Sequence, residues 1–291
     1  MGFKCGIVGL PNVGKSTLFN ALTASKNAEA ANFPFCTIDP NIGIVDVKDI
    51  RLDKLSDLSK SKKKIYTNIT LVDIAGLVKG ASKGEGLGNK FLSHIREVDA
   101  IIHLVRCFES EKITHVSSEI NPHNDLETIK TEILLADIDI IQKKLEKGKK
   151  KLLKPSEIEL LEKKIKSLNN GSDRSSETEE EEKFLQSIGL LSTKPKIIVC
   201  NVDENSLSNG NKFTNSIKEK YPNEKVVIIC ADIEDQIMGL DNDERETFMK
   251  DIGLDKTGLN QLIKEGYDLL NLDTFFTSGP EESRAWTIKK N

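Results

Sequence analysis

The chain has 291 residues, of which 37% are hydrophobic and 30% are charged, and its formal net charge is −4. This composition can bury a sizeable core, and the mildly acidic balance argues against a protein that coats nucleic acid by bulk charge. No run of 18 apolar residues predicts a membrane-spanning helix, and the N-terminus lacks the layout of a signal peptide. The five cysteines form no CxxC pair, which favours reduced thiols in a cytoplasmic protein over a zinc site or disulfides.

Short apolar runs alternate with helical patterns along most of the chain. Phe3–Gly9 predicts a buried strand closed by glycine, and Lys15–Thr23 follows with helical spacing. Further predicted elements, in chain order, are strands at Ile42–Val47, Ile69–Ile74, Ala100–Arg106, Lys196–Asn201 and Val226–Ala231, and a closing helix at Leu259–Leu270. This alternation predicts an α/β fold with a mostly parallel central sheet.

The middle of the chain interrupts the alternation, because no strand is predicted between about Asn124 and Leu191. Apolar residues recur there at helical spacing, and Pro155-Ser156 followed by Glu159 predicts a new helix with Ser156 as its N-cap. We interpret this stretch as an antiparallel helical hairpin inserted into the α/β domain. Its Lys143–Lys154 segment is rich in lysine, which predicts either a solvated helix face or a contact with RNA or another polyanion.

The strongest chemical signal is Gly9–Ser16, GLPNVGKS, which fits the phosphate-binding pattern G-x-x-x-x-G-K-S between a predicted strand and a predicted helix. Gly9 and Gly14 let the backbone turn its N–H groups toward phosphate oxygens, and the following helix N-terminus favours negative charge. Lys15 is expected to reach the β- and γ-phosphates, and Ser16 to offer its hydroxyl to Mg²⁺.

Two weaker motifs follow in the expected order. Asp73–Gly76 matches D-x-x-G, in which Asp73 orders Mg²⁺ through water and the Gly76 N–H senses the γ-phosphate. Thr37 precedes the second predicted strand, where its hydroxyl can bind Mg²⁺ when a triphosphate is present. Together with the phosphate loop, these motifs indicate a GTPase-type switch domain.

Leu77 departs from this pattern, because many such enzymes place a glutamine there to orient the attacking water. Hydrolysis must therefore use another group or be slow. The available imidazoles are His94 and His115, and each is more readily explained as structural; His115 remains a candidate catalytic residue. Asn12 is a candidate ligand for K⁺, with a plain turn residue as the alternative.

The base-recognition segment also departs from the guanine-specific pattern N-K-x-D. The corresponding residues are Asn201-Val202-Asp203-Glu204, so that Glu204, one methylene longer, stands where the aspartate pairs with guanine. Ala231 lies in Cys230-Ala231-Asp232, which replaces the usual S-A-K. A site built on hydrogen bonds discriminates strongly, so these changes point to ATP or to relaxed purine choice.

The combination of motifs resembles the YchF subfamily of Obg-like ATPases. The resembling segments are GLPNVGKS at 9–16, NFPFCTIDPN at 32–41, DIAGLVKGA at 73–81, GEGLGN at 84–89, VRCFE at 105–109 and NVDE at 201–204. The resemblance implies a P-loop protein that prefers ATP over GTP, hydrolyses it with a hydrophobic residue at the position of Leu77, and associates with ribosomes.

The resemblance also assigns residues to ligands. It implies that the phosphates are held by Asn12, Val13, Gly14, Lys15, Ser16 and Thr17. It places Ser16 and Thr37 on Mg²⁺, and Asn201 and Val202 against adenine.

The domain organisation implied by the resemblance is a G domain at 1–123 and 193–273, a helical coiled-coil insertion at 124–192, and an incomplete TGS domain beginning at 274–291. The segment Thr274–Lys290 is expected to supply the opening strand of that last domain. Three functions remain open: a slow Mg²⁺-dependent ATPase that regulates translation or a stress response, an Obg-type GTPase, and a nucleotide-gated scaffold whose turnover is incidental.

Overall fold

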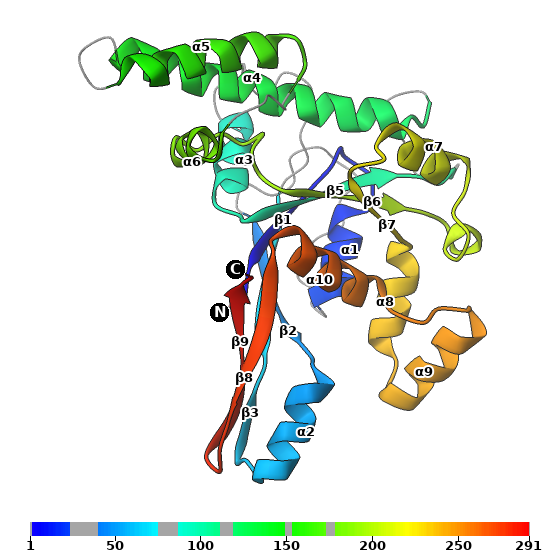
Figure 1. Ribbon diagram of the computed structural model, residues 1–291. Coiled ribbons are helices and arrows are strands. Elements are labelled where there is room, and N and C mark those ends of the chain that lie inside the picture. The colour runs from blue at the N-terminus through cyan, green and yellow to red at the C-terminus, as the bar shows by residue number, and fades with distance from the viewer. Residues whose placement is uncertain are drawn as a thin grey trace.

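The computed structural model describes residues 2–23, 40–74, 87–110, 119–148, 153–172 and 178–290. Its central feature is a six-stranded sheet with the order β2-β4-β1-β5-β6-β7 (Figure 1). The strands are β1 (Lys4–Val8), β2 (Asn41–Val47), β4 (Thr67–Asp73), β5 (Ala100–Arg106), β6 (Lys196–Asn201) and β7 (Lys225–Ile229). Four of the five pairings are parallel and only edge strand β2 runs antiparallel, to β4. The predicted α/β fold with a mostly parallel sheet is confirmed.

Helices cover both faces of this sheet, so its central strand β5 is buried along its whole length (Figure 1). Helices α1 (Lys15–Thr23) and α10 (Gly258–Leu269) lie on one face, and α4 (Pro122–Gly148) and α7 (Lys212–Lys220) lie on the other. The remaining helices of this part are α3 (Leu87–Arg96), α8 (Ala231–Gly239), α9 (Asn242–Asp251) and the short 3₁₀ turn η2 (Glu204–Ser206).

The predicted helical hairpin is formed by α4 and α5 (Pro155–Asn169), with α6 (Glu179–Ser187) packed beside it (Figure 1). Ile141 and Leu161 are completely buried between these helices, as their spacing predicts. The predicted N-cap at Ser156 was wrong by two residues. Pro155 is the first helical residue, because its fixed φ suits that position, and the Lys154 N–H donates to Glu157 Oε2 at 2.7 Å.

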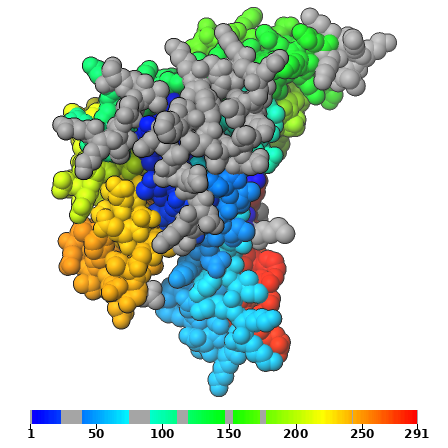
Figure 2. Space-filling view, turned by 180° about the vertical axis from the view of Figure 1, so that it is seen from behind, coloured from blue at the N-terminus to red at the C-terminus, as the bar shows by residue number. Residues whose placement is uncertain are grey.

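A second, three-stranded sheet has the order β3-β9-β8, with β3 (Lys63–Ile65), β8 (Leu272–Ser278) and β9 (Glu282–Lys289). It packs against α2 (Ile50–Ser59), and Figure 2 shows them as a lobe separate from that of α8 and α9. The prediction of a single strand at Thr274–Lys290 was wrong. The chain reverses at Gly279-Pro280, so that β8 and β9 form an antiparallel hairpin. The assignment of 274–291 to a TGS domain stays a prediction.

Within the described ranges, no helix combines the length and the apolar character needed to span a membrane. The cysteines in the same ranges, Cys5, Cys107, Cys200 and Cys230, are buried and unbridged.

Candidate functional site

The loop between β1 and α1 is shaped by two glycines. Gly14 has a φ of +95°, and a Cβ there would lie 2.4 Å from Asn201 Nδ2. At Gly9 a Cβ would lie 2.6 Å from the backbone oxygen of Leu104 on β5. Neither position leaves room for a side chain, so glycine at both allows the tight turn of the loop at the end of the sheet. Helix α1 begins directly after this turn, and the Leu18 N–H donates to the Gly14 backbone oxygen at 2.9 Å.

Lys15 is the first residue of α1, and its side chain is 9% exposed. Its Nζ donates to the backbone oxygen of Leu10 at 3.0 Å, across the same loop. Burial lowers the pKa of Lys15 to about 8, and the nearby Asp73 carboxylate opposes that shift only in part. A buried ammonium group with so little opposing charge is suited to an anionic ligand.

Ser16 and Asp73 bring a hydroxyl and a carboxylate together beside Lys15. Ser16 Oγ donates to Asp73 Oδ2 at 3.2 Å, joining the start of α1 to the end of β4. Burial raises the pKa of Asp73, against the opposing effects of Lys15, Ser16 and Asn41. These hard oxygen ligands fit Mg²⁺. Among the residues that the structure describes, no group of three or more His, Cys, Asp or Glu side chains could hold a metal ion.

Asn201, the last residue of β6, connects three parts of the site. Its Nδ2 donates to the backbone oxygen of Val13 at 2.9 Å, and its Oδ1 accepts from the Ala231 N–H at 3.0 Å. Its side chain therefore ties the phosphate-type loop to the N-terminus of α8. Sequence reasoning gave Asn201 only a contact with the base, and missed this framing role.

A cavity of about 380 Å³ opens next to this loop, a size typical of small-molecule sites. Its walls include seven residues that the sequence assigned to the site: Asn12, Gly14, Thr17, Asn201, Val202, Glu204 and Ala231. They also include Phe108, Glu109 and Ser110, which sequence reasoning did not assign individually. His94 does not line this cavity. The predicted residues Thr37, Gly76, Leu77 and His115 lie outside the described residues.

The segment that follows β6 presents different groups to the cavity. Val202 is 2% exposed and packs into the core, so it offers the cavity little of its side chain. The Asp203 carboxylate accepts from Ser206 N–H at 3.1 Å and Ser206 Oγ at 3.0 Å, which caps η2. Glu204 is exposed and lines the cavity, as do Glu109 and Asp232, so carboxylates other than that of Asp203 can meet a ligand.

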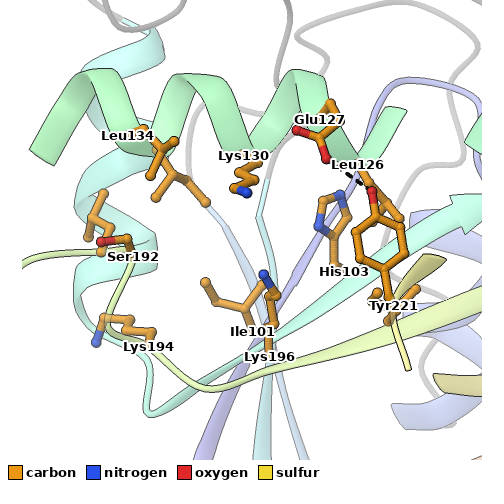
Figure 3. A pocket seen from close by; sticks show the side chains of 13 residues that line it. Ile101, His103, Leu126, Glu127, Lys130, Leu134, Ser192, Lys194, Lys196 and Tyr221 are labelled. Atoms are coloured by element: carbon orange, nitrogen blue, oxygen red, sulfur yellow. Dashed lines mark hydrogen bonds between the residues drawn. The ribbon is translucent and has the colours of Figure 1, made fainter. Parts of the chain in front are cut away.

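A second cavity lies between α4 and strands β5 and β6 (Figure 3). His103 points into it from β5, and its Nε2 has no hydrogen-bond partner among the described residues. Burial, with a smaller effect of Lys196, lowers the pKa of His103 to about 3, so the ring is neutral at pH 7. At the rim, Tyr221 donates to Glu127 Oε1 at 3.0 Å. This cavity contains no residue of the phosphate-type loop, so it is not part of the same site.

Comparison with known proteins decides the family. Residues 4–137 match the family model of the 50S ribosome-binding GTPases. The whole chain is 50% identical to the ribosome-binding ATPase YchF of Escherichia coli O157:H7, covering 99% of this chain and 81% of that protein. It is 48% identical to the ribosome-binding ATPase YchF of Bacillus subtilis, covering 100% and 82%. The chain belongs to the YchF family.

A solved YchF structure confirms the fold. The Schizosaccharomyces pombe YchF GTPase matches this chain with a TM-score of 0.82 and 36% identity, covering 99% of this chain and 81% of that one. The resemblance to YchF seen in the motifs is thereby confirmed. The motif VRCFE, which carried part of it, contains Phe108 and Glu109 of the cavity wall. That motif was the sequence signal for the part of the site that residue-by-residue reasoning missed.

Proposed function

We propose that this chain is a Mg²⁺-dependent ATPase that acts as a nucleotide switch on the ribosome. One observation carries the proposal: the buried ammonium of Lys15 lies beside the Ser16–Asp73 pair, next to a cavity of nucleotide size. The names of the bacterial relatives, ribosome-binding ATPases, support both the substrate and the partner.

In this proposal each residue of the loop has one task. Lys15 neutralises charge on the terminal phosphates, and the backbone N–H groups around Gly14 bind their oxygens. Ser16 and Asp73 would hold Mg²⁺, and the ion would supply positive charge against the phosphates. Asn12, which lines the cavity with a left-handed φ of 62°, is the proposed K⁺ ligand.

The choice of ATP rests on the groups that face the base. Glu204 stands where guanine-specific sites place an aspartate, and the Asp203 carboxylate is occupied in capping η2. A misplaced acceptor loses the two hydrogen bonds that select guanine. A GTPase of the Obg type is the alternative, and the Schizosaccharomyces pombe relative is described as a GTPase.

Affinity and turnover test this choice. Purified protein should bind and hydrolyse Mg·ATP, whereas Lys15→Ala should do neither and the exposed control Lys218→Ala should behave as wild type. Tenfold tighter binding of GTP than of ATP, equal to about 1.4 kcal/mol, would establish the GTPase instead. Turnover no faster than in Lys15→Ala, with ATP still bound, would favour a nucleotide-gated scaffold. Replacing K⁺ by Na⁺ in the same assay tests the Asn12 site.

The lysine-rich end of the α4–α5 hairpin is the proposed contact with ribosomal RNA. Lys143, Lys144 and Lys154 are exposed there, and Lys143 pairs with Asp139 at 2.6 Å at the surface. Phosphate contacts by lysines release counterions, so binding should weaken steeply as salt rises. Ribosome co-sedimentation should fall when these three lysines become alanine. A matched triple variant, Lys54, Lys63 and Lys250 to alanine, should leave it unchanged. Binding that ignores both salt and the first triple variant would contradict the contact.

A further inference from the structure

Arg106 ends strand β5 and is 1% exposed, the largest side chain among the fully buried ones of the described residues. An arginine does not lose its proton in a protein, so its charge must be compensated inside. A buried charge is seldom needed for packing alone, because an apolar side chain in the same place would avoid the free-energy cost of removing the guanidinium from water. Its contacts show what the charge is used for.

The guanidinium of Arg106 holds the cavity wall from behind. Nε donates to the backbone oxygen of Phe108 at 3.1 Å, and Nη2 donates to that of Ser110 at 3.3 Å. The same group lies 4.7 Å from the centre of the Phe108 ring, in a cation–π contact. Two carbonyls and one ring of the wall Phe108–Ser110 are therefore fixed by one planar, forked side chain.

Two other side chains of the described residues contact this wall or its base. The Asn211 side chain donates to the backbone oxygen of Cys107 at 2.7 Å, at the base of the wall. Glu109 pairs with Lys212 at 2.7 Å, but both side chains are more than 60% exposed, at 67% and 72%. Exposed pairs contribute little, so among the described residues Arg106 is the buried side chain that anchors Phe108 and Ser110.

The charge that balances Arg106 comes from a different element. Burial lowers the pKa of the Arg106 guanidinium, and the Asp125 carboxylate opposes that shift. Asp125 is 1% exposed and lies in the first turn of α4, the helix that continues into the α4–α5 hairpin. The cavity wall is thus linked through one buried charge pair to the hairpin.

We propose that Arg106 is a positioning residue that holds the Phe108–Ser110 wall against the nucleotide base, with Asp125 of α4 as its counter-charge. The inference rests on the proposed function, because it assigns this cavity to the base. The position of the wall then determines the affinity for ligands that carry a base. The affinity of the phosphate loop for phosphates without a base does not depend on it. Arg106 acts through the wall, so it is expected to change KM more than kcat.

The test compares two ligands, Mg·ATP and Mg·tripolyphosphate, by calorimetry on the full chain. In Arg106→Lys, which keeps the charge but loses the fork, the Kd for ATP should rise about tenfold, as expected for the loss of one charge-assisted hydrogen bond. The Kd for tripolyphosphate should stay within twofold. KM for ATP should rise in step with Kd, while kcat changes by less than twofold.

Asp125→Asn is the second variant, since it keeps the shape of the carboxylate and removes only its charge. It should weaken ATP binding in the same direction, again with tripolyphosphate unchanged. The matched control is Arg245→Lys, because Arg245 also donates to two backbone oxygens, those of Ile237 and Leu240, at the far end of α8. That control should bind both ligands as wild type does.

The outcomes separate the inference from the proposed function. Unchanged ATP affinity in both Arg106→Lys and Asp125→Asn would overturn the positioning role while leaving the ATPase intact. An equal loss for ATP and tripolyphosphate would also overturn it, since a general disturbance of the site would then explain the data. A wild-type chain that binds tripolyphosphate but no nucleotide would instead refute the proposed function. If Arg106→Lys does not fold, Asp125→Asn alone decides.

Discussion

Replacing Asn201 by alanine should destabilise the protein even without a ligand. The amide of Asn201 satisfies the backbone oxygen of Val13 at 2.9 Å and the backbone N–H of Ala231 at 3.0 Å. Alanine would leave both backbone groups without their partner, at about 1–3 kcal/mol each. We therefore expect a loss of about 2–6 kcal/mol in the free energy of unfolding.

Differential scanning calorimetry measures this loss as a lower melting temperature. For a chain of this size, at about 2 °C per kcal/mol, the expected decrease is roughly 4–12 °C. Asn201→Asp should be destabilised too, because its carboxylate still accepts from Ala231 but faces the Val13 oxygen without a proton to donate. The control is Asn205→Ala, since Asn205 is exposed in η2 and should melt within 2 °C of wild type. An Asn201→Ala melting temperature equally close to wild type would refute the framing role.

Three further predictions follow from burial and backbone geometry. Bound phosphates would raise the pKa of Lys15 from about 8, so above pH 8 nucleotide binding should take up a proton and weaken up to tenfold per pH unit. Calorimetry in two buffers with different ionisation enthalpies measures this proton uptake, and equal binding enthalpies in both buffers above pH 8 would contradict it. The pKa of buried His103 falls from 6.5 in the unfolded chain to about 3, so its contribution to stability is complete above pH 6.5 and decreases toward pH 3. At pH 5 the free energy of unfolding of the wild type should be about 2 kcal/mol lower than at pH 7, and this decrease should be absent in His103→Leu. Chemical denaturation at both pH values measures it, and the same decrease in the wild type and the variant would contradict the prediction. Gly14→Ala should abolish ATP binding, since its Cβ would lie 2.4 Å from Asn201, whereas Gly239→Ala, with no atom within 4 Å, should bind normally in the same titration.

The phosphate loop and the main strands could be predicted because their signals are local. Gly9 and Gly14 mark a turn that only glycine allows, and the apolar run Ala100–Arg106 needs no distant partner to indicate a buried strand. Strand β3 was not predicted, because Lys63–Ile65 carries no strand pattern and exists through pairing with β9 near the other end of the chain. Pairing with so distant a segment leaves no strand pattern in Lys63–Ile65 itself.

The role of Arg106 was hidden for a different reason. Its partners Phe108 and Ser110 are close in sequence, yet only the fold shows that the arginine is buried and that the buried Asp125 carboxylate acts on its charge. An arginine at a strand end is normally expected at the surface. Sequence therefore identified the motif around it, and the burial that gives the motif its physical meaning came from the tertiary structure.

Asn201 and Arg106 together connect the phosphate loop, the Phe108–Ser110 wall and α4 through interactions that involve only a few residues. The backbone oxygen of Asn201 accepts from the Cys107 N–H at 2.8 Å, directly before the wall that Arg106 holds, while its side chain reaches Val13. A shift of α4 at Asp125 can therefore reach the cavity wall and the phosphate loop, first through the charge interaction with Arg106 and then through hydrogen bonds. Coupling between two binding sites is reciprocal, so a partner on the α4–α5 hairpin that tightens nucleotide binding must itself bind more tightly, by the same factor, when nucleotide is present. The short buried route favours such coupling in this chain over independent action of the hairpin and the nucleotide site.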